Sequence, residues 1–216
     1  MKNIKAIIFD FDGVVVDSEH LYEETGHQLF RQYGIKVSEK DWQIFKGLTA
    51  KDFFNTLIQR YNLKVTPEEL AEADHKILKQ KFRAKLAYIP GFQDFLKMVK
   101  NDYKLALVTS TSSSLLNWIF ENTKVNRDFE LILTADDVDH HKPHPMPYLS
   151  VAKKLQICPT EMLVIEDSVN GVVSAKSAGS KVVGFLTSFI ASDLCEADYH
   201  AANYRELSEL IKNIGS

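Results

Sequence analysis

Residues 5–13 of the 216-residue chain read KAIIFDFDG, a short apolar run that stops at two aspartates and a glycine. The run from Ala6 to Phe9 is continuously apolar, which is typical of a strand buried on both faces of a parallel sheet. In such a sheet, ligands gather at the carboxyl ends of the strands. Asp10 and Asp12 therefore stand where a functional site is expected.

Four further apolar runs resemble the first, and helix-length segments lie between them. The five predicted strands are Lys5–Phe9, Leu105–Val108, Leu131–Leu133, Met162–Ile165 and Lys181–Phe185. Residues 91–100 and 168–178 have the apolar spacing of amphipathic helices, and the second segment is followed by Gly179, a typical helix stop. Alternating strands and helices predict an α/β fold with a parallel sheet and right-handed crossovers.

One interval, from about Asp17 to Tyr88, carries helix signals and no strand signal. Residues 20–33 are amphipathic, residues 66–69 form a capping-box sequence with a proline, and residues 38–41 and 49–52 are further expected helix starts. We therefore expect a core domain of residues 1–16 and 87–216 and a helical domain of residues 17–86. Its recurring aromatic residues are expected to pack inside it: Trp42, Phe45, Phe53, Phe54 and Tyr61.

Composition and charge narrow the class of protein. The chain has 26 Lys and Arg against 29 Asp and Glu, a net charge of −3, and 45% hydrophobic residues. These values exclude a disordered or collagen-like chain. They also show no excess of positive charge that would indicate binding to nucleic acid or anionic membranes. The first apolar run is too short for a signal peptide or a membrane span. We expect a cytoplasmic monomer with no nucleic-acid or membrane partner.

The two cysteines, Cys158 and Cys195, match no disulfide framework, metal motif or redox motif. We expect them to be buried or half-buried thiols without a function.

Polar residues follow two other predicted strands, and a lysine lies between them in the sequence. The set comprises Thr109, Ser110, Thr111 and Ser112, then Lys142, then Glu166, Asp167 and Ser168. Oxygen ligands without histidine or cysteine favour a hard cation such as Mg²⁺. Taken singly, an aspartate turn, a hydroxyl cap and a solvated lysine are ordinary structural features. Together at one sheet edge they suit a phosphoryl group bridged by a divalent cation.

Four segments resemble, in order, the motifs of the haloacid dehalogenase (HAD) superfamily. They are Asp10-Phe11-Asp12-Gly13-Val14, Thr109, Lys142-Pro143 and Glu166-Asp167-Ser168. The resemblance spans nearly the whole chain and implies a Rossmann-like core with a helical C1 cap inserted after the first strand. It is nearest to the β-phosphoglucomutase-like branch, which includes sugar-phosphate phosphatases.

The resemblance also implies a mechanism. Asp10 would attack phosphorus to form an aspartyl-phosphate, and Asp12 would act as general acid and then general base. Mg²⁺ would be held by the side chains of Asp10 and Asp167 and the backbone carbonyl of Asp12, with Glu166 acting through water.

Further residues are implied for binding the phosphoryl group and the substrate. Thr109 and the backbone N–H of Ser110 would bind phosphoryl oxygens, and Lys142 would neutralise charge and pair with Asp10. In the cap, Lys46 and Lys51 are the candidate substrate contacts.

Two departures from the mutase pattern favour a phosphatase. Tyr22 stands where a mutase has a cap histidine, and Ala50 stands where it has an arginine. The expected function is Mg²⁺-dependent hydrolysis of a small phosphomonoester, with a sugar phosphate as first candidate and a phosphosugar mutase as the alternative. A dehalogenase needs no Mg²⁺, and a phosphate sensor needs no Asp12 beside Asp10, so both are disfavoured.

The third motif departs from the family pattern. Met146 stands where an acidic residue is usual, and His140, His141 and His144 surround Lys142. A metal site at these histidines is disfavoured because no acidic or cysteine partner is expected beside them.

Overall fold

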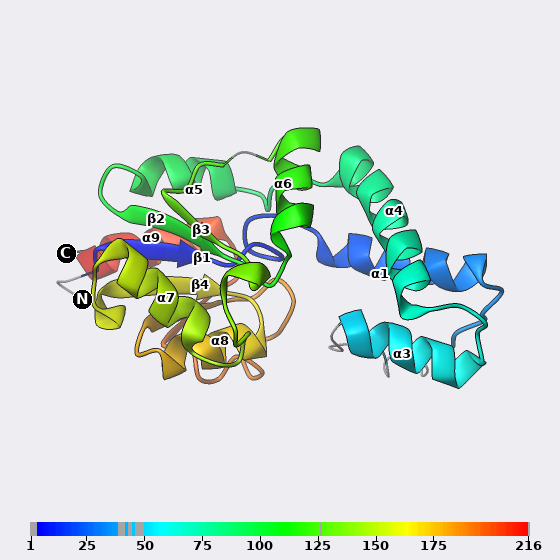
Figure 1. Cartoon of the computed structure of the whole chain (residues 1–216). Coiled ribbons are helices and arrows are strands. Elements are labelled where there is room, and N and C mark those ends of the chain that lie inside the picture. Colours follow the sequence, from blue (N-terminus) through cyan, green and yellow to red (C-terminus); the bar gives the residue numbers. More distant parts are fainter. Residues whose placement is uncertain (1–3, 39–41, 43–44, 46–49, 126, 216) are drawn as a thin grey trace. The chain divides into compact units, whose positions relative to one another are not determined.

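The computed structural model describes residues 4–38, 42, 45, 50–125 and 127–215. The chain forms two compact units, Met1–Asp17 with Ala87–Ser216, and Ser18–Leu86 (Figure 1). The first is an α/β unit and the second is helical.

The α/β unit is built on one six-stranded sheet with the order β3-β2-β1-β4-β5-β6, and neighbouring strands run parallel. The strands are β1 (Ala6–Phe9), β2 (Lys104–Val108), β3 (Leu131–Leu133), β4 (Met162–Glu166), β5 (Lys181–Phe185) and β6 (Tyr199–Ala201). This confirms the predicted parallel α/β fold and its five strands. β6 was not predicted, because its three residues at the sheet edge include an exposed histidine and form no apolar run.

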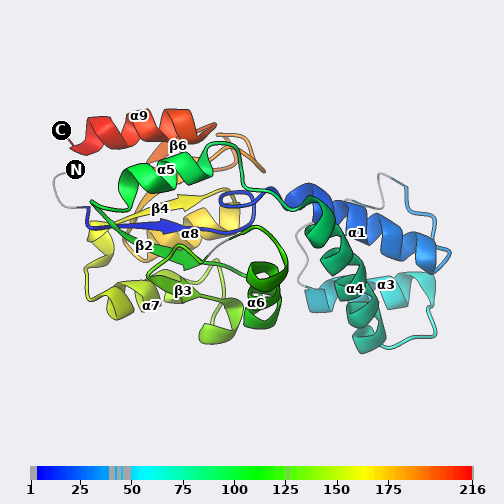
Figure 2. The ribbon, with the colours of Figure 1, turned by 90° about the horizontal axis from the view of Figure 1, so that it is seen from above.

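Helices cover both faces of this sheet (Figure 2). They are α5 (Phe92–Val99), α6 (Ser113–Asn122), α7 (Met146–Leu155), α8 (Val169–Ser177) and α9 (Tyr204–Gly215). Phe9 of β1 meets Phe92 and Phe95 of α5, with ring centroids 5.7 and 6.1 Å apart. Its neighbour Ile8 belongs to the core cluster that includes Tyr148 of α7. Because β1 and β4 are buried on both faces, polar groups can gather only where these strands end.

Among its described residues, the helical unit contains α1 (Glu19–Gln32), α3 (Ala50–Tyr61) and α4 (Pro67–Lys85). The predicted capping box is present, since the Glu69 N–H donates to Thr66 Oγ1 and the Thr66 N–H donates to Glu69 Oε2. The aromatic residues pack inside the unit as expected, with Trp42, Phe45 and Phe54 buried and Phe53 and Tyr61 against them. Lys46, the Lys51 side chain and the helix start at 39–41 lie outside the described residues.

The chain leaves and re-enters the α/β unit along two segments that bond to each other. The Asp17 N–H donates to the Ala87 carbonyl at 3.0 Å, and the Ile89 N–H donates to the Val15 carbonyl at 3.0 Å. These bonds fix the segment that follows Asp10 and Asp12.

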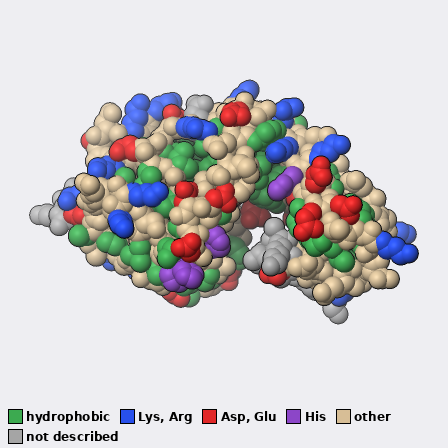
Figure 3. All heavy atoms as spheres, viewed as in Figure 1, with side chains coloured by type: hydrophobic (Ala, Val, Ile, Leu, Met, Phe, Trp, Pro, Cys, Tyr) green, Lys and Arg blue, Asp and Glu red, His purple; other side chains and the backbone are tan. Residues whose placement is uncertain are grey.

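The surface carries charges of both signs, which are interspersed over the face shown in Figure 3. Both cysteines are free and exposed, so the expectation of buried or half-buried thiols was wrong. Within the described ranges, no helix combines the length and apolar character that a bilayer-spanning segment requires.

Candidate active site

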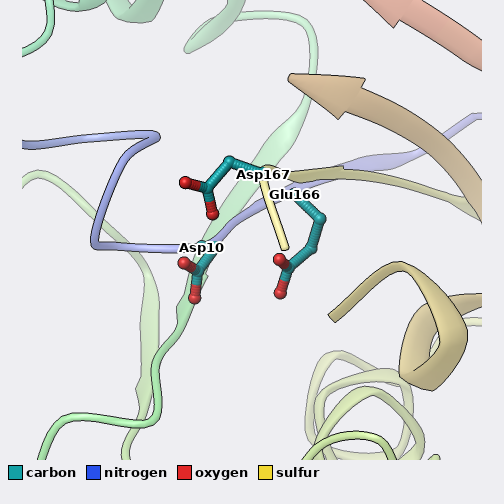
Figure 4. Close-up of side chains that lie close together, drawn as sticks. All are labelled: Asp10, Glu166 and Asp167. Atoms are coloured by element: carbon teal, nitrogen blue, oxygen red, sulfur yellow. The ribbon is translucent and has the colours of Figure 1, made fainter. Parts of the chain in front are cut away.

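Three buried carboxyl groups meet where the two central strands end (Figure 4). Asp10 follows β1, and Glu166 and Asp167 lie at the end of β4, which pairs directly with β1. The pairing continues into the site, because the Asp10 N–H donates to the Ile165 carbonyl at 3.0 Å. One oxygen of each carboxylate lies within 4.8 Å of the others. Strand register therefore brings together residues that are far apart in the sequence.

Lys142 inserts its ammonium group between two of these carboxylates. Its Nζ donates to Asp10 Oδ1 at 2.6 Å, to Glu166 Oε1 at 2.5 Å, and to the Val108 carbonyl at 3.3 Å. Its side chain is only 7% exposed. This lysine is thus a buried counter-ion of the carboxyl cluster, and not a solvated surface charge.

Glu166 is fully buried and receives further donors besides Lys142. The Tyr148 hydroxyl donates to Oε1 at 2.7 Å, and the Ser168 hydroxyl donates to Oε2 at 3.0 Å. Gly171 must be glycine here, because a Cβ at that position would lie 1.9 Å from the Glu166 carboxyl carbon. The carboxylate is therefore held in one orientation against Lys142, and Tyr148 is a site residue that the sequence analysis did not find.

Asp167 lies against the turn that follows β1. A Cβ on Gly13 would come within 1.9 Å of Asp167 Oδ2, and Gly13 has a φ of 72°, which favours glycine. The Ser188 hydroxyl donates to the same oxygen, and the Thr187 hydroxyl donates to the Gly13 carbonyl at 2.6 Å. Thr187 and Ser188 follow β5 and were also not found from the sequence.

The hydroxyl run after β2 borders Asp12. Thr109 is buried and its Oγ1 accepts the Thr111 N–H at 3.0 Å, which leaves its own O–H able to donate elsewhere. The Thr111 hydroxyl donates to Asp12 Oδ2 at 3.0 Å. Ser110 is exposed between them. Thr111 thus orients Asp12, a contact that the sequence did not reveal.

The electrostatics of the cluster leave an excess of negative charge. Burial raises the pKa of Asp10 well above its usual range, and the neighbouring carboxylates Glu166, Asp167 and Asp12 raise it further, while Lys142 lowers it. The carboxylates outnumber the single buried lysine, so a further cation is needed to keep them all ionised. An all-oxygen donor set suits Mg²⁺, and the residues present therefore fit this metal.

The histidines around Lys142 form contacts of their own. The rings of His140 and His144 lie 4.6 Å apart, and His144 Nδ1 accepts the Met146 N–H at 3.1 Å. Asp136 lies close enough to His141 for the two to interact electrostatically. An acidic residue therefore lies near one of these histidines, and the expectation that they form no metal site stays a prediction. Met146 begins α7, and the Ser174 hydroxyl secures the loop by donating to the His144 carbonyl at 2.6 Å.

Comparisons with known proteins agree with this arrangement. Residues 7–185 match the model of the haloacid dehalogenase-like hydrolase family. The chain is 36% identical over 183 residues to a Bacillus subtilis (strain 168) protein with the provisional name phosphatase YhcW, covering 83% of this chain and 82% of the relative. It is 32% identical over 177 residues to the phosphorylated carbohydrates phosphatase of Thermotoga maritima, covering 82% of each chain.

A solved structure is also similar. A Thermotoga maritima protein that carries a provisional β-phosphoglucomutase name superposes with a TM-score of 0.85 at 30% identity, covering 98% of this chain and 100% of that one.

Proposed function

The chain belongs to the haloacid dehalogenase-like hydrolase family and is a phosphatase of that superfamily, and we propose that it hydrolyses a small phosphomonoester through an aspartyl-phosphate. One observation carries the proposal. Asp10 lies in a buried carboxyl cluster at the sheet edge, with Lys142 Nζ 2.6 Å from its Oδ1. Burial and the neighbouring carboxylates raise the pKa of Asp10 above its usual range, although Lys142 lowers it. The added charge of a bound Mg²⁺ would favour the ionised carboxylate, which is suited to act as a nucleophile.

In the proposed first step, a carboxylate oxygen of Asp10 attacks phosphorus and the bond to the leaving oxygen breaks. Asp12 gives its proton to that leaving oxygen. In the second step Asp12 takes a proton from water, the water oxygen attacks phosphorus, and Asp10 is released as a carboxylate with inorganic phosphate. The bond from Thr111 to Asp12 Oδ2 supports this role, because it holds the Asp12 carboxyl in one orientation.

The other site residues bind and neutralise the phosphoryl group in this proposal. The Thr109 hydroxyl and the Ser110 N–H donate to its oxygens, and Lys142 offsets its charge. Mg²⁺ would supply further positive charge, held by Asp10, Asp167 and the backbone carbonyl of Asp12, with Glu166 acting through water. Phosphoryl transfer depends mainly on such positioning and charge stabilisation.

The proposed substrate is a sugar phosphate. Support comes from the Thermotoga maritima relative, which is named for phosphorylated carbohydrates, and from a fructose-1-phosphate phosphatase of Escherichia coli that is 23% identical over 177 residues. Lys46 and Lys51 remain the proposed cap contacts. We further propose that the enzyme acts in the cytoplasm, as a monomer, on a freely diffusing metabolite.

A phosphosugar mutase is the second candidate, favoured by the similarity to the provisionally named β-phosphoglucomutase. The residue at the position of the mutase histidine argues against it. Tyr22 stands there, and its ring packs edge-on against Phe82 with centroids 5.5 Å apart. No imidazole is present at that position to serve a mutase cap.

A substrate screen tests the proposal and separates the two candidates. Hexose, pentose and triose phosphates are incubated with Mg²⁺ and enzyme, and both inorganic phosphate and isomeric sugar phosphates are measured. We expect one inorganic phosphate to be released for each sugar phosphate consumed. The kcat/KM of Asp10→Asn should be lower by about 10⁴-fold, which corresponds to ~5.4 kcal/mol of transition-state stabilisation. The exposed Asp128→Asn variant is the matched control. Isomer formation without released phosphate would establish the mutase, and full activity of Asp10→Asn would refute the nucleophile.

A further inference from the structure

The segment that follows β5 reaches back to the carboxyl cluster. Thr187 and Ser188 are exposed residues, yet both hydroxyls are bonded to groups at the edge of the site. Exposed hydroxyls can be satisfied by water, so folding alone does not require these two bonds. Their targets are Gly13, which directly follows Asp12, and Asp167.

The two hydroxyls serve different acceptors. Thr187 Oγ1 lies 2.6 Å from the Gly13 carbonyl and 3.4 Å from Asp167 Oδ2, and it has a single hydrogen to donate. The shorter contact identifies the Gly13 carbonyl as its acceptor. Ser188 Oγ then supplies the hydroxyl bond to Asp167 Oδ2.

Three chain segments therefore meet at one carboxyl group. The turn after β1 presses Gly13 against Asp167, the end of β4 supplies Asp167 itself, and the segment after β5 bonds to both. A carboxylate can rotate broadly about its last side-chain torsion unless its partners restrain it. The Ser188 hydroxyl and the close approach of Gly13 provide this restraint.

We propose that Ser188 and Thr187 are positioning residues for the metal centre, an inference that rests on the Mg²⁺ site of the proposed function. Ser188 sets the orientation of the Asp167 carboxylate, and Thr187 sets the Gly13 peptide next to the Asp12 carbonyl. Hydrogen-bond partners of metal-binding carboxylates change metal affinity by about 10–100-fold when they are removed. Neither residue contacts the reacting atoms in this scheme, so their loss acts through the metal and not through the chemical step.

The test measures Mg²⁺ binding directly. Isothermal titration calorimetry of EDTA-treated, dialysed protein with Mg²⁺ gives the dissociation constant for wild type, Ser188→Ala, Ser188→Thr and Ser192→Ala. Ser192 is an exposed serine in the same segment and is the matched control. We expect the dissociation constant of Ser188→Ala to rise by about 10–100-fold, while Ser188→Thr, which keeps the hydroxyl, and Ser192→Ala stay within about threefold of wild type.

Kinetics and folding measurements complete the test. In Ser188→Ala the Mg²⁺ concentration for half-maximal activity should rise by the same factor, with kcat at saturating Mg²⁺ close to wild type. Circular dichroism should be unchanged, because the side chain is exposed. If Ser188→Ala binds Mg²⁺ with the same affinity as the wild type, the positioning role of Ser188 is overturned and the proposed function remains intact. Absence of saturable Mg²⁺ binding to the wild type would overturn the metal site itself, and this inference with it.

Discussion

At the scale of single residues, the site depends on how one buried glutamate is satisfied. Glu166 has no exposed surface, and it accepts hydrogen bonds from Lys142, Tyr148 and Ser168. Removing a hydrogen-bond donor from a buried ionised group lowers the free energy of unfolding more than removing one from an exposed group, because water cannot replace the missing bond. The Tyr148 hydroxyl is thus a structural requirement of the charged cluster.

Replacing Tyr148 with phenylalanine tests this requirement. The substitution keeps the ring and removes the hydroxyl that donates to Glu166 at 2.7 Å. We expect the free energy of unfolding to fall by about 1.5–3 kcal/mol, as for other hydrogen bonds to charged groups, measured by urea denaturation. Tyr103→Phe, at a half-buried tyrosine outside the site, is the control. Equal stability of the two variants would show that Glu166 does not need this donor.

The residues of the site were predictable to different extents. Asp10, Glu166 and Asp167 could be placed from the sequence because they stand at the ends of two continuous apolar runs. Ser188 and Tyr148 could not be placed, because they reach their carboxylates across 21 and 18 positions of sequence. Which side of a loop or helix faces a site depends on packing between elements, and local patterns carry no signal for it.

At the scale of elements, the strands also differ in how well their own sequence predicts them. β1 and β4 are buried on both faces and read as unbroken apolar runs. β6 lies at the edge of the sheet and includes the exposed His200. Its position comes from pairing with β5, so its strand conformation depends on a tertiary contact and not on its own composition.

The packing of α1 against α4 gives a pH-dependent prediction. Glu24 of α1 accepts hydrogen bonds from Lys85 and Lys81 of α4, and these bonds lower its pKa from 4.5 to about 2. Since the folded-state pKa is depressed, the stabilisation is complete above about pH 4.5 and is lost as the pH falls toward about 2. Its size is modest because the Glu24 side chain is 40% exposed.

We therefore expect Glu24→Gln to lower the thermal midpoint of unfolding at pH 7. The difference from wild type should narrow as the pH falls below about 4.5. Glu72→Gln, at an exposed glutamate of α4, is the control and should show no such trend. A difference that stays constant across this range would contradict the assignment of the low pKa to these two lysines.

At the scale of the whole molecule, the chain has two units with separate hydrophobic cores. Every described member of the proposed catalytic and metal-binding set lies in the α/β unit: Asp10, Asp12, Thr109, Ser110, Lys142, Glu166 and Asp167. A ligand that binds only the folded α/β unit stabilises it by mass action. Metal binding should therefore be visible in the stability of the protein as well as in its activity.

Mg²⁺ at about 100 times its dissociation constant should stabilise the α/β unit by about 2.7 kcal/mol. Thermal unfolding with Mg²⁺ and with EDTA measures this effect, and activity should vanish in EDTA and return with excess Mg²⁺. Asp167→Asn, which removes a carboxylate of the cluster, should lose most of the Mg²⁺-dependent shift. A shift of the same size in this variant would place the cation elsewhere.

Chemical trapping of the phosphorylated carboxylate is the most direct test of Asp10 as the nucleophile. A reaction quenched within its first turnovers is treated with borohydride, which reduces an acyl phosphate to an alcohol and leaves free carboxylates intact, and the peptides are then analysed by mass spectrometry. We expect reduction at Asp10, dependent on both substrate and Mg²⁺, with Asp12 and Asp167 unchanged. Turnover of substrate with Asp10 never modified, or reduction at another carboxylate, would contradict this role of Asp10.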